Sequence, residues 1–171
     1  DYEDKDFGMV SLKDEEMVSN MFQKISNQID YRFRITYVNK NTKEGFTEAA
    51  VRNAINDTTI RPNDIVIFYY SGLGTYSAKS VLPSLQLENP ALLSLNKFTL
   101  LPLDDVAAVL QTKNIRLGMV MADCRNKMTD RYPIPIPRNT IVQEDRTKEI
   151  LQKRFLGESC RILKIASVQK G

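Results

Sequence analysis

The sequence predicts an α/β protein, a three-layer αβα sandwich with a mostly parallel central sheet. Two continuous apolar runs, at 64–71 and 115–122, have the composition of strands that are buried on both faces. Helical and strand-like patterns alternate along the chain, and this order is typical of a parallel sheet with helices on both faces. The 171 residues, 42% of them hydrophobic, suffice for a sizeable core, so we expect a single domain over residues 1–171.

The first third of the chain predicts two helices and a strand. Apolar side chains recur at helical spacing from about 12 to 28, which predicts an amphipathic helix. Residues 31–38 alternate apolar side chains with Arg and Thr, which predicts a half-exposed strand near a sheet edge. Thr47 is a good N-cap for a second helix, which should end near Thr59 because Pro62 cannot continue it.

The middle of the chain holds both buried strands. After the run at 64–71, residues 75–102 contain three prolines and predict a long irregular stretch, in which 97–101 is a candidate short strand. Asp104 is placed to cap a short helix that leads into the run at 115–122.

The last part of the chain predicts a loop, a helix and a strand. The segment 127–144 contains prolines that exclude a central strand. A helix from about 145 to 155 should stop at Gly157, which is a natural residue after a helix end. The apolar segment 160–168 is then the final strand.

Composition excludes several classes of chemistry. The chain has no histidine, which removes the commonest metal ligand and the commonest general base. Its two cysteines, Cys124 and Cys160, are too few for a cysteine-built metal site. The glycines at 72 and 74 predict a turn at the end of the strand 64–71. This turn is a weak dinucleotide signal, because a third glycine and a directly following helix are missing. We therefore expect no metal and no cofactor.

Charge and hydropathy limit the kinds of partner that the sequence indicates. The net charge of +3 is too small to indicate nucleic-acid or membrane-surface binding. No apolar stretch approaches the roughly 20 residues that a membrane-spanning helix needs. The chain does not begin with Met, which is compatible with export after removal of a signal peptide, and the sequence leaves the location open.

The ends of the two buried strands resemble those of caspase-like cysteine peptidases. Tyr70-Ser71-Gly72-Leu73-Gly74 is similar to the family's Tyr-Ser-Gly-His-Gly motif. Ala122-Asp123-Cys124-Arg125-Asn126 is similar to the second catalytic strand, which ends in Asp-x-Cys, and most closely to the metacaspase-like bacterial branch, where that end often has Asp-Cys-Cys-Asn. Weaker similarity covers most of the chain. It implies a caspase-like fold, and we expect the pocket-forming segments that the family has after this point to follow Gly171. The absence of an initiator Met is compatible with a further leading segment before Asp1.

The resemblance also implies that the catalytic pair is degenerate. Leu73 stands at the histidine position, and leucine can neither accept nor donate a proton. If Asp123 is aligned with the Asp of Asp-x-Cys, Arg125 stands at the nucleophile position; this register is favoured because Asn126 then matches too. In the other register, which follows the Ala-Cys-Arg-Gly form of animal caspases, Cys124 remains the nucleophile.

Three functions follow as expectations. The favoured one is a catalytically inactive pseudopeptidase that binds or regulates a protein or peptide partner, with Asp123 and the backbone N–H of Gly74 as binding positions. The second is a residual cysteine peptidase that uses Cys124 and prefers basic residues. The third is a small-ligand α/β domain outside the family. Caspase relatives often dimerise through an edge strand, so residues 160–168 are the candidate for a homodimer contact.

Asp123 has two expected roles. In basic-specific members of the family, the matching Asp lines the pocket for the substrate's Arg or Lys, and Arg125 would then plug this pocket. Asp123 is equally well placed to cap a helix that follows the strand.

Overall fold

The computed structural model describes residues 5–39, 45–57, 59–76, 82–88, 98–128, 152–153, 156 and 161–169. The chain divides into two compact units, one made of residues 1–35 and 140–157 and the other of residues 36–139 and 158–171. The first unit contains α1 (Lys5–Gln28), and the second contains the sheet and the candidate site.

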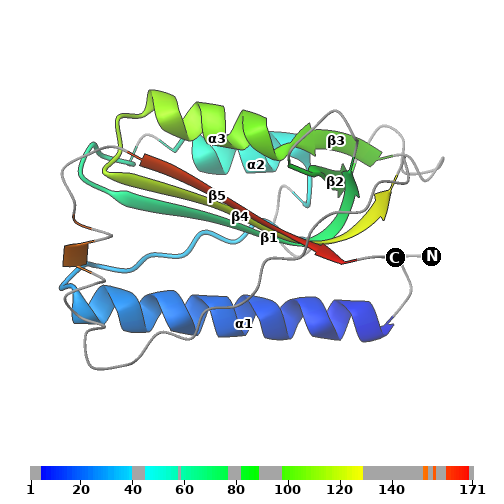
Figure 1. Cartoon of the computed structure of the whole chain (residues 1–171), viewed down its shortest axis with the longest axis horizontal. Helices are drawn as coiled ribbons and strands as arrows, with labels where there is room; N and C mark the ends of the chain where they lie inside the picture. The colour runs from blue at the N-terminus through cyan, green and yellow to red at the C-terminus, as the bar shows by residue number, and fades with distance from the viewer. Residues whose placement is uncertain are drawn as a thin grey trace. The chain divides into compact units, whose positions relative to one another are not determined.

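A mixed five-stranded sheet forms the centre of the second unit, with the strand order β3-β2-β1-β4-β5 (Figure 1). Strands β1, β4 and β5 are parallel, whereas β2 and β3 form an antiparallel pair that continues the sheet beyond β1. The fold is therefore α/β, as expected, with a parallel centre and an antiparallel edge. The strand bounds are β1 Ile65–Tyr76, β2 Ser84–Glu88, β3 Phe98–Pro102, β4 Leu117–Met128 and β5 Arg161–Gln169.

Two helices, α2 (Glu48–Ile55) and α3 (Leu103–Thr112), cover one face of this sheet (Figure 1). They contribute apolar side chains to a core that also includes inward-facing residues of β1, β2, β3 and β4. Removing this apolar surface from water is the main favourable term in folding. The buried cluster is Val51, Ile55, Tyr70, Leu82, Leu85, Leu87, Leu101, Leu103, Val106, Ala107, Leu110, Ile115, Val120, Ala122 and Cys124.

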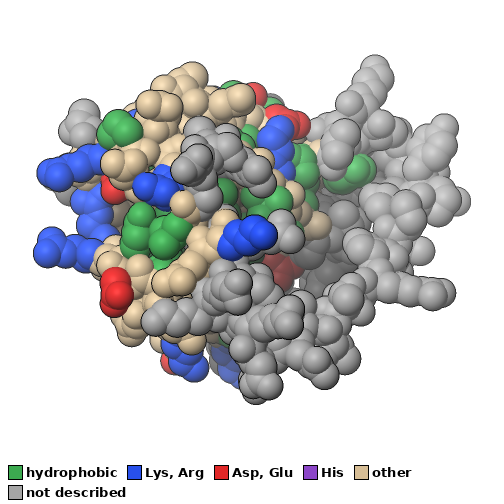
Figure 2. Space-filling view, turned by 60° about the vertical axis from the view of Figure 1, so that its left-hand side comes forward, with side chains coloured by type: hydrophobic (Ala, Val, Ile, Leu, Met, Phe, Trp, Pro, Cys, Tyr) green, Lys and Arg blue, Asp and Glu red, His purple; other side chains and the backbone are tan. Residues whose placement is uncertain are grey.

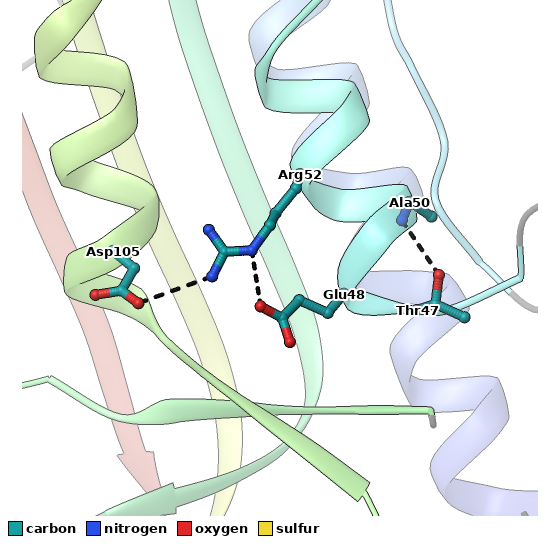
Figure 3. Close-up of polar contacts among 5 residues, drawn as sticks. All are labelled: Thr47, Glu48, Ala50, Arg52 and Asp105. Carbon is teal, nitrogen blue, oxygen red and sulfur yellow. Dashed lines mark hydrogen bonds and ion pairs between the residues drawn. The ribbon is translucent and has the colours of Figure 1, made fainter. Parts of the chain in front are cut away.

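The start of α2 is fixed by a cap, as the sequence predicts (Figure 3). The side chain of Thr47 accepts a hydrogen bond from the backbone N–H of Ala50 at 3.1 Å. Arg52 pairs with Glu48 one turn earlier at 2.7 Å, and its guanidinium lies 3.9 Å from Asp105 of α3. These ion pairs are partly exposed, so we expect them to orient the two helices more than to stabilise them.

Two helix boundaries differ from those expected. Helix α2 ends at Ile55 rather than near Thr59 because the carboxylate of Asp57 accepts a hydrogen bond from the N–H of Thr59 at 2.8 Å, which forms a turn there. Helix α3 begins at Leu103, so the acidic Asp104 lies inside its first turn and is not its cap. An acid in the first turn still interacts favourably with the helix dipole.

The strands differ from the predicted ones more than the helices do. The expected strand at 31–38 is wrong, because these residues form no part of the sheet; alternation indicates a side-chain pattern but supplies no partner strand. The expected irregular stretch at 75–102 is wrong in part, since it contains β2 and β3, and the candidate strand at 97–101 is confirmed as β3. The expected helix start near 12 is also wrong, because α1 already begins at Lys5.

The remaining expectations concern the last part of the chain, membrane spans and surface charge. The strand expected at 160–168 is confirmed as β5. The proline-rich loop and the helix at 145–155 lie almost wholly outside the described residues. Within the described part, none of the helices is long and apolar enough to cross a bilayer. On the face drawn in Figure 2, Lys and Arg side chains are interspersed with Asp and Glu, in keeping with the net charge of +3.

Candidate functional site

The candidate site lies where the parallel strands β1 and β4 run side by side toward their carboxyl ends. A turn sets the register: Asp64 accepts a hydrogen bond from the N–H of Arg61 at 2.8 Å, and its carbonyl accepts one from the N–H of Arg116 at 3.0 Å. From there the pairing begins with Ile65 opposite Leu117 and continues without interruption to the ends of both strands. The two segments identified from the sequence are therefore direct neighbours.

The register decides which residues meet. Leu73 lies opposite Arg125, and Ser71 lies opposite Asp123. Because side chains alternate between the two faces of a strand, these four residues share one face of the sheet. The structure thus brings together the two positions that the favoured alignment assigns to the degenerate pair.

Cys124 lies on the opposite face. It is paired with Gly72, its exposed fraction is 0%, and it belongs to the core beneath α3. Burial, reinforced by the negative charge of the neighbouring Asp123, raises the pKa of the Cys124 thiol to about 12. A base at position 73 would therefore point away from this thiol.

Gly74 and Asp123 are placed differently from what the sequence suggested. Strand β1 continues through Gly72 and Gly74 to Tyr76, so the expected turn after residue 71 is wrong. Gly74 is buried between its partners Leu85 and Asn126. Strand β4 likewise runs on to Met128, which excludes the role of Asp123 as the cap of a following helix. Asp123 is half-buried on the face that carries Leu73.

Sequence reasoning missed Tyr70. Its hydroxyl donates a hydrogen bond to the carbonyl of Leu73, with the oxygens 2.6 Å apart, and lies 3.1 Å from the carbonyl oxygen of Gln86 in β2. A Cβ atom on Gly72 would lie 2.7 Å from this hydroxyl, so only glycine leaves room for it. The signal was present in the sequence as an aromatic residue two positions before a glycine in a buried strand.

The described residues offer little for a metal ion. Among them, no group of three or more His, Cys, Asp or Glu side chains could hold a metal ion. The chemistry that the site can offer is therefore that of an apolar side chain, a carboxylate, hydroxyls and backbone groups at two adjacent strand ends.

Comparison with known proteins agrees with the resemblance of the two strand ends. A family model described as the caspase domain matches residues 9–163, which is most of the chain and includes both strand ends. No curated protein and no solved structure matches the chain significantly. The sheet with a parallel centre, the adjacent strand ends and the extent of the match lead to one conclusion: the chain belongs to the caspase-domain family.

Proposed function

We propose that the chain is a catalytically inactive member of this family, a pseudopeptidase that binds a protein or peptide without cleaving it. The observation that carries the proposal is the register in which Leu73 lies opposite Arg125. Cleavage by a cysteine peptidase needs a thiolate and a base within hydrogen-bond reach. Leucine has no titratable atom and a guanidinium stays protonated, so this pair supplies neither group.

The properties of Cys124 disfavour a residual peptidase. A thiol with a pKa of about 12 is ionised in about one molecule in a hundred thousand at pH 7. Its side chain is fully buried and faces away from Leu73. Even an exposed thiolate would leave the departing amine without a proton donor, and loss of one member of a catalytic unit commonly costs several orders of magnitude in rate.

Fluorogenic peptides that end in Arg, Lys or Asp test the absence of catalysis. We expect the wild-type chain to release no more fluorophore than its Cys124→Ala variant, because neither contains a usable nucleophile. Turnover that disappears in the Cys124→Ala variant would instead identify the chain as a residual cysteine peptidase.

Asp123 and Arg125 support a binding role. They stand two residues apart on β4, so both lie on the face of Leu73. In the basic-specific members that the chain resembles, the Asp at this position attracts the Arg or Lys of the substrate. We propose that Arg125 takes the place of that substrate residue and plugs the former pocket, while the Gly74 backbone lines its floor.

An affinity measurement tests the plug. Calorimetric titration with a short Arg-containing peptide should show tighter binding to Arg125→Ala than to the wild type, because the pocket acid loses its internal cation. The double variant Asp123→Asn/Arg125→Ala is the control, and it should lose that gain. An Arg125→Ala variant with unchanged affinity would count against the plug and leave the absence of catalysis unaffected.

The exposed strand β5 supports a proposal about self-association. This strand has β4 as its neighbour in the described sheet and exposes Leu163 and Ile165. We propose that it mediates a homodimer. The remaining alternative, a small-ligand domain outside the family, is wrong because the chain belongs to the family.

A further inference from the structure

Tyr70 occupies an unusual place for a polar side chain. Its exposed fraction is 4%, and its ring stacks on Phe46 with centroids 5.8 Å apart and an angle of 14° between the ring planes. Buried tyrosines normally satisfy their hydroxyl, and this one does so at the carbonyls of Leu73 and Gln86. The ring therefore extends along β1 from its own position to the residue at the degenerate histidine position.

Gly72 leaves the space that the ring and hydroxyl of Tyr70 occupy. A Cβ atom there would lie 2.7 Å from the hydroxyl oxygen and 2.8 Å from Cζ of Tyr70. Both contacts are far inside the van der Waals distance, and an aromatic ring cannot yield at one atom as a flexible side chain can. The tyrosine at position 70 therefore requires a glycine at position 72.

A second bond ties the same strand end from the other face. The side-chain amide of Gln86 donates to the hydroxyl of Thr75 at 2.9 Å. Thr75 shares the face of Leu73, whereas Tyr70 is on the core face. Gln86 is thus held at its backbone by Tyr70 and at its side chain by Thr75, so β1 and β2 are joined on both sides of the sheet.

We infer that Tyr70 is the positioning residue of the proposed binding site. Its hydroxyl fixes the end of β1 against β2 and so determines how residue 73 faces residue 125. The inference rests on the proposed function in one respect only, namely that this strand end is a binding surface. A strand end held in this way presents a preformed surface, and preformed surfaces lose less ordering entropy when a partner binds.

The Tyr70→Phe variant tests this inference because it keeps the ring and removes the hydroxyl. We expect hydrogen exchange at the amides of residues 72–76 to be about five- to tenfold faster in the variant than in the wild type. This factor corresponds to the net free energy of about one lost hydrogen bond. Amides of residues 66–68, in the same strand, should change by less than twofold. The matched control is Tyr37→Phe, which removes the same atom from an exposed side chain and should change neither group.

Two outcomes would overturn the inference. Equal acceleration at residues 66–68 and 72–76 would mean that Tyr70 stabilises the fold as a whole and positions nothing. Unchanged exchange at both would mean that the hydroxyl bonds do not hold the strand end. Neither outcome depends on whether peptides are cleaved, so a failure here is distinct from a failure of the proposed function.

Discussion

At the scale of single residues, the site has a leucine without a titratable group and a cysteine whose thiol has a pKa of about 12. Leu73 and Cys124 stand on neighbouring strands but on opposite faces, so a base introduced at position 73 would face away from the Cys124 thiol. Family resemblance identified both positions from the sequence alone. It left two registers open, because the choice between them depends on which face of the sheet each side chain takes, and a strand of unknown neighbours does not reveal that.

The first prediction concerns the reactivity of Cys124. In a Cys160→Ser variant, which isolates this thiol, alkylation by iodoacetamide at pH 8 should be at least about a thousandfold slower than that of an ordinary thiol, because a pKa of about 12 leaves about one thiolate in ten thousand. The rate should rise about tenfold per pH unit until the pH approaches that pKa or the fold opens. Intact-mass spectrometry measures the labelled fraction. The same variant in denaturant is the control and should label fast, whereas rapid labelling of the folded chain would contradict the buried position.

The second prediction places a thiol at the position opposite Leu73. In Arg125→Cys, the new thiol should have a lower pKa when Leu73→His is also present, by about one unit, because an imidazolium beside a thiol favours the thiolate. The pH dependence of alkylation, followed at the peptide that contains residue 125, gives this pKa. Leu73→His alone should leave Cys124 unreactive, since the two side chains face opposite sides. An unchanged pKa in the double variant would show that positions 73 and 125 do not meet in solution.

At the scale of elements, β1 is longer than its apolar run. Glycines at 72 and 74 predicted a turn, yet both lie inside the strand because the space above Gly72 is filled by Tyr70 and because Gly74 pairs with Leu85. The apolar run itself was predictable, since burial on both faces leaves a clear compositional mark. The direction of the Tyr70 ring was not predictable, because its hydroxyl meets the carbonyl of Leu73 in the same strand and also that of Gln86 in β2, and the position of β2 beside β1 is set only by the folded sheet.

The third prediction compares two glycines of the sheet. Gly72→Ala should destabilise the fold by about 1–3 kcal/mol, because the added methyl must displace a rigid ring that carries two hydrogen bonds. Gly118→Ala is the matched control: the atom nearest to its methyl is the terminal Cδ1 of the half-buried Ile162, which can turn aside, while Cδ1 of the buried Ile115 lies 3.3 Å away and has to shift only slightly, so we expect a smaller loss. Urea denaturation measures both. Equal losses would show that the fit between Tyr70 and Gly72 adds nothing specific.

At the scale of the whole molecule, alternation of helices and strands predicted the α/β class, and two strand ends together with the family match placed the chain among caspase-domain proteins. The antiparallel pair β2 and β3 was largely missed. Its strands are short, β2 directly follows Pro83 and β3 ends at Pro102. Its inward side chains Leu85, Leu87 and Leu101 form a stripe only once the two strands pair. Pairing between segments is a property of the folded sheet, which local patterns do not contain.

The last prediction concerns association through β5. In the described sheet this strand is at the edge, and Leu163 and Ile165 are 47% and 42% exposed. An antiparallel contact about a two-fold axis near Lys164 would place Leu163 of one copy beside Ile165 of the other. The charge between them does not oppose this contact, because Lys164 is paired with Asp104 of its own chain at 2.6 Å.

Sedimentation equilibrium over a range of concentrations measures this dimer. Ile165→Lys should weaken it at least tenfold, because it buries a charge in an apolar contact. Leu100→Lys makes the same change at a side chain that is 50% exposed on β3, the strand at the other edge, and should leave the dimer intact. A wild-type chain that stays monomeric throughout, or equal weakening by both variants, would contradict an interface at β5. An intact dimer in Leu100→Lys combined with monomeric Ile165→Lys is the result that only a β5 interface produces.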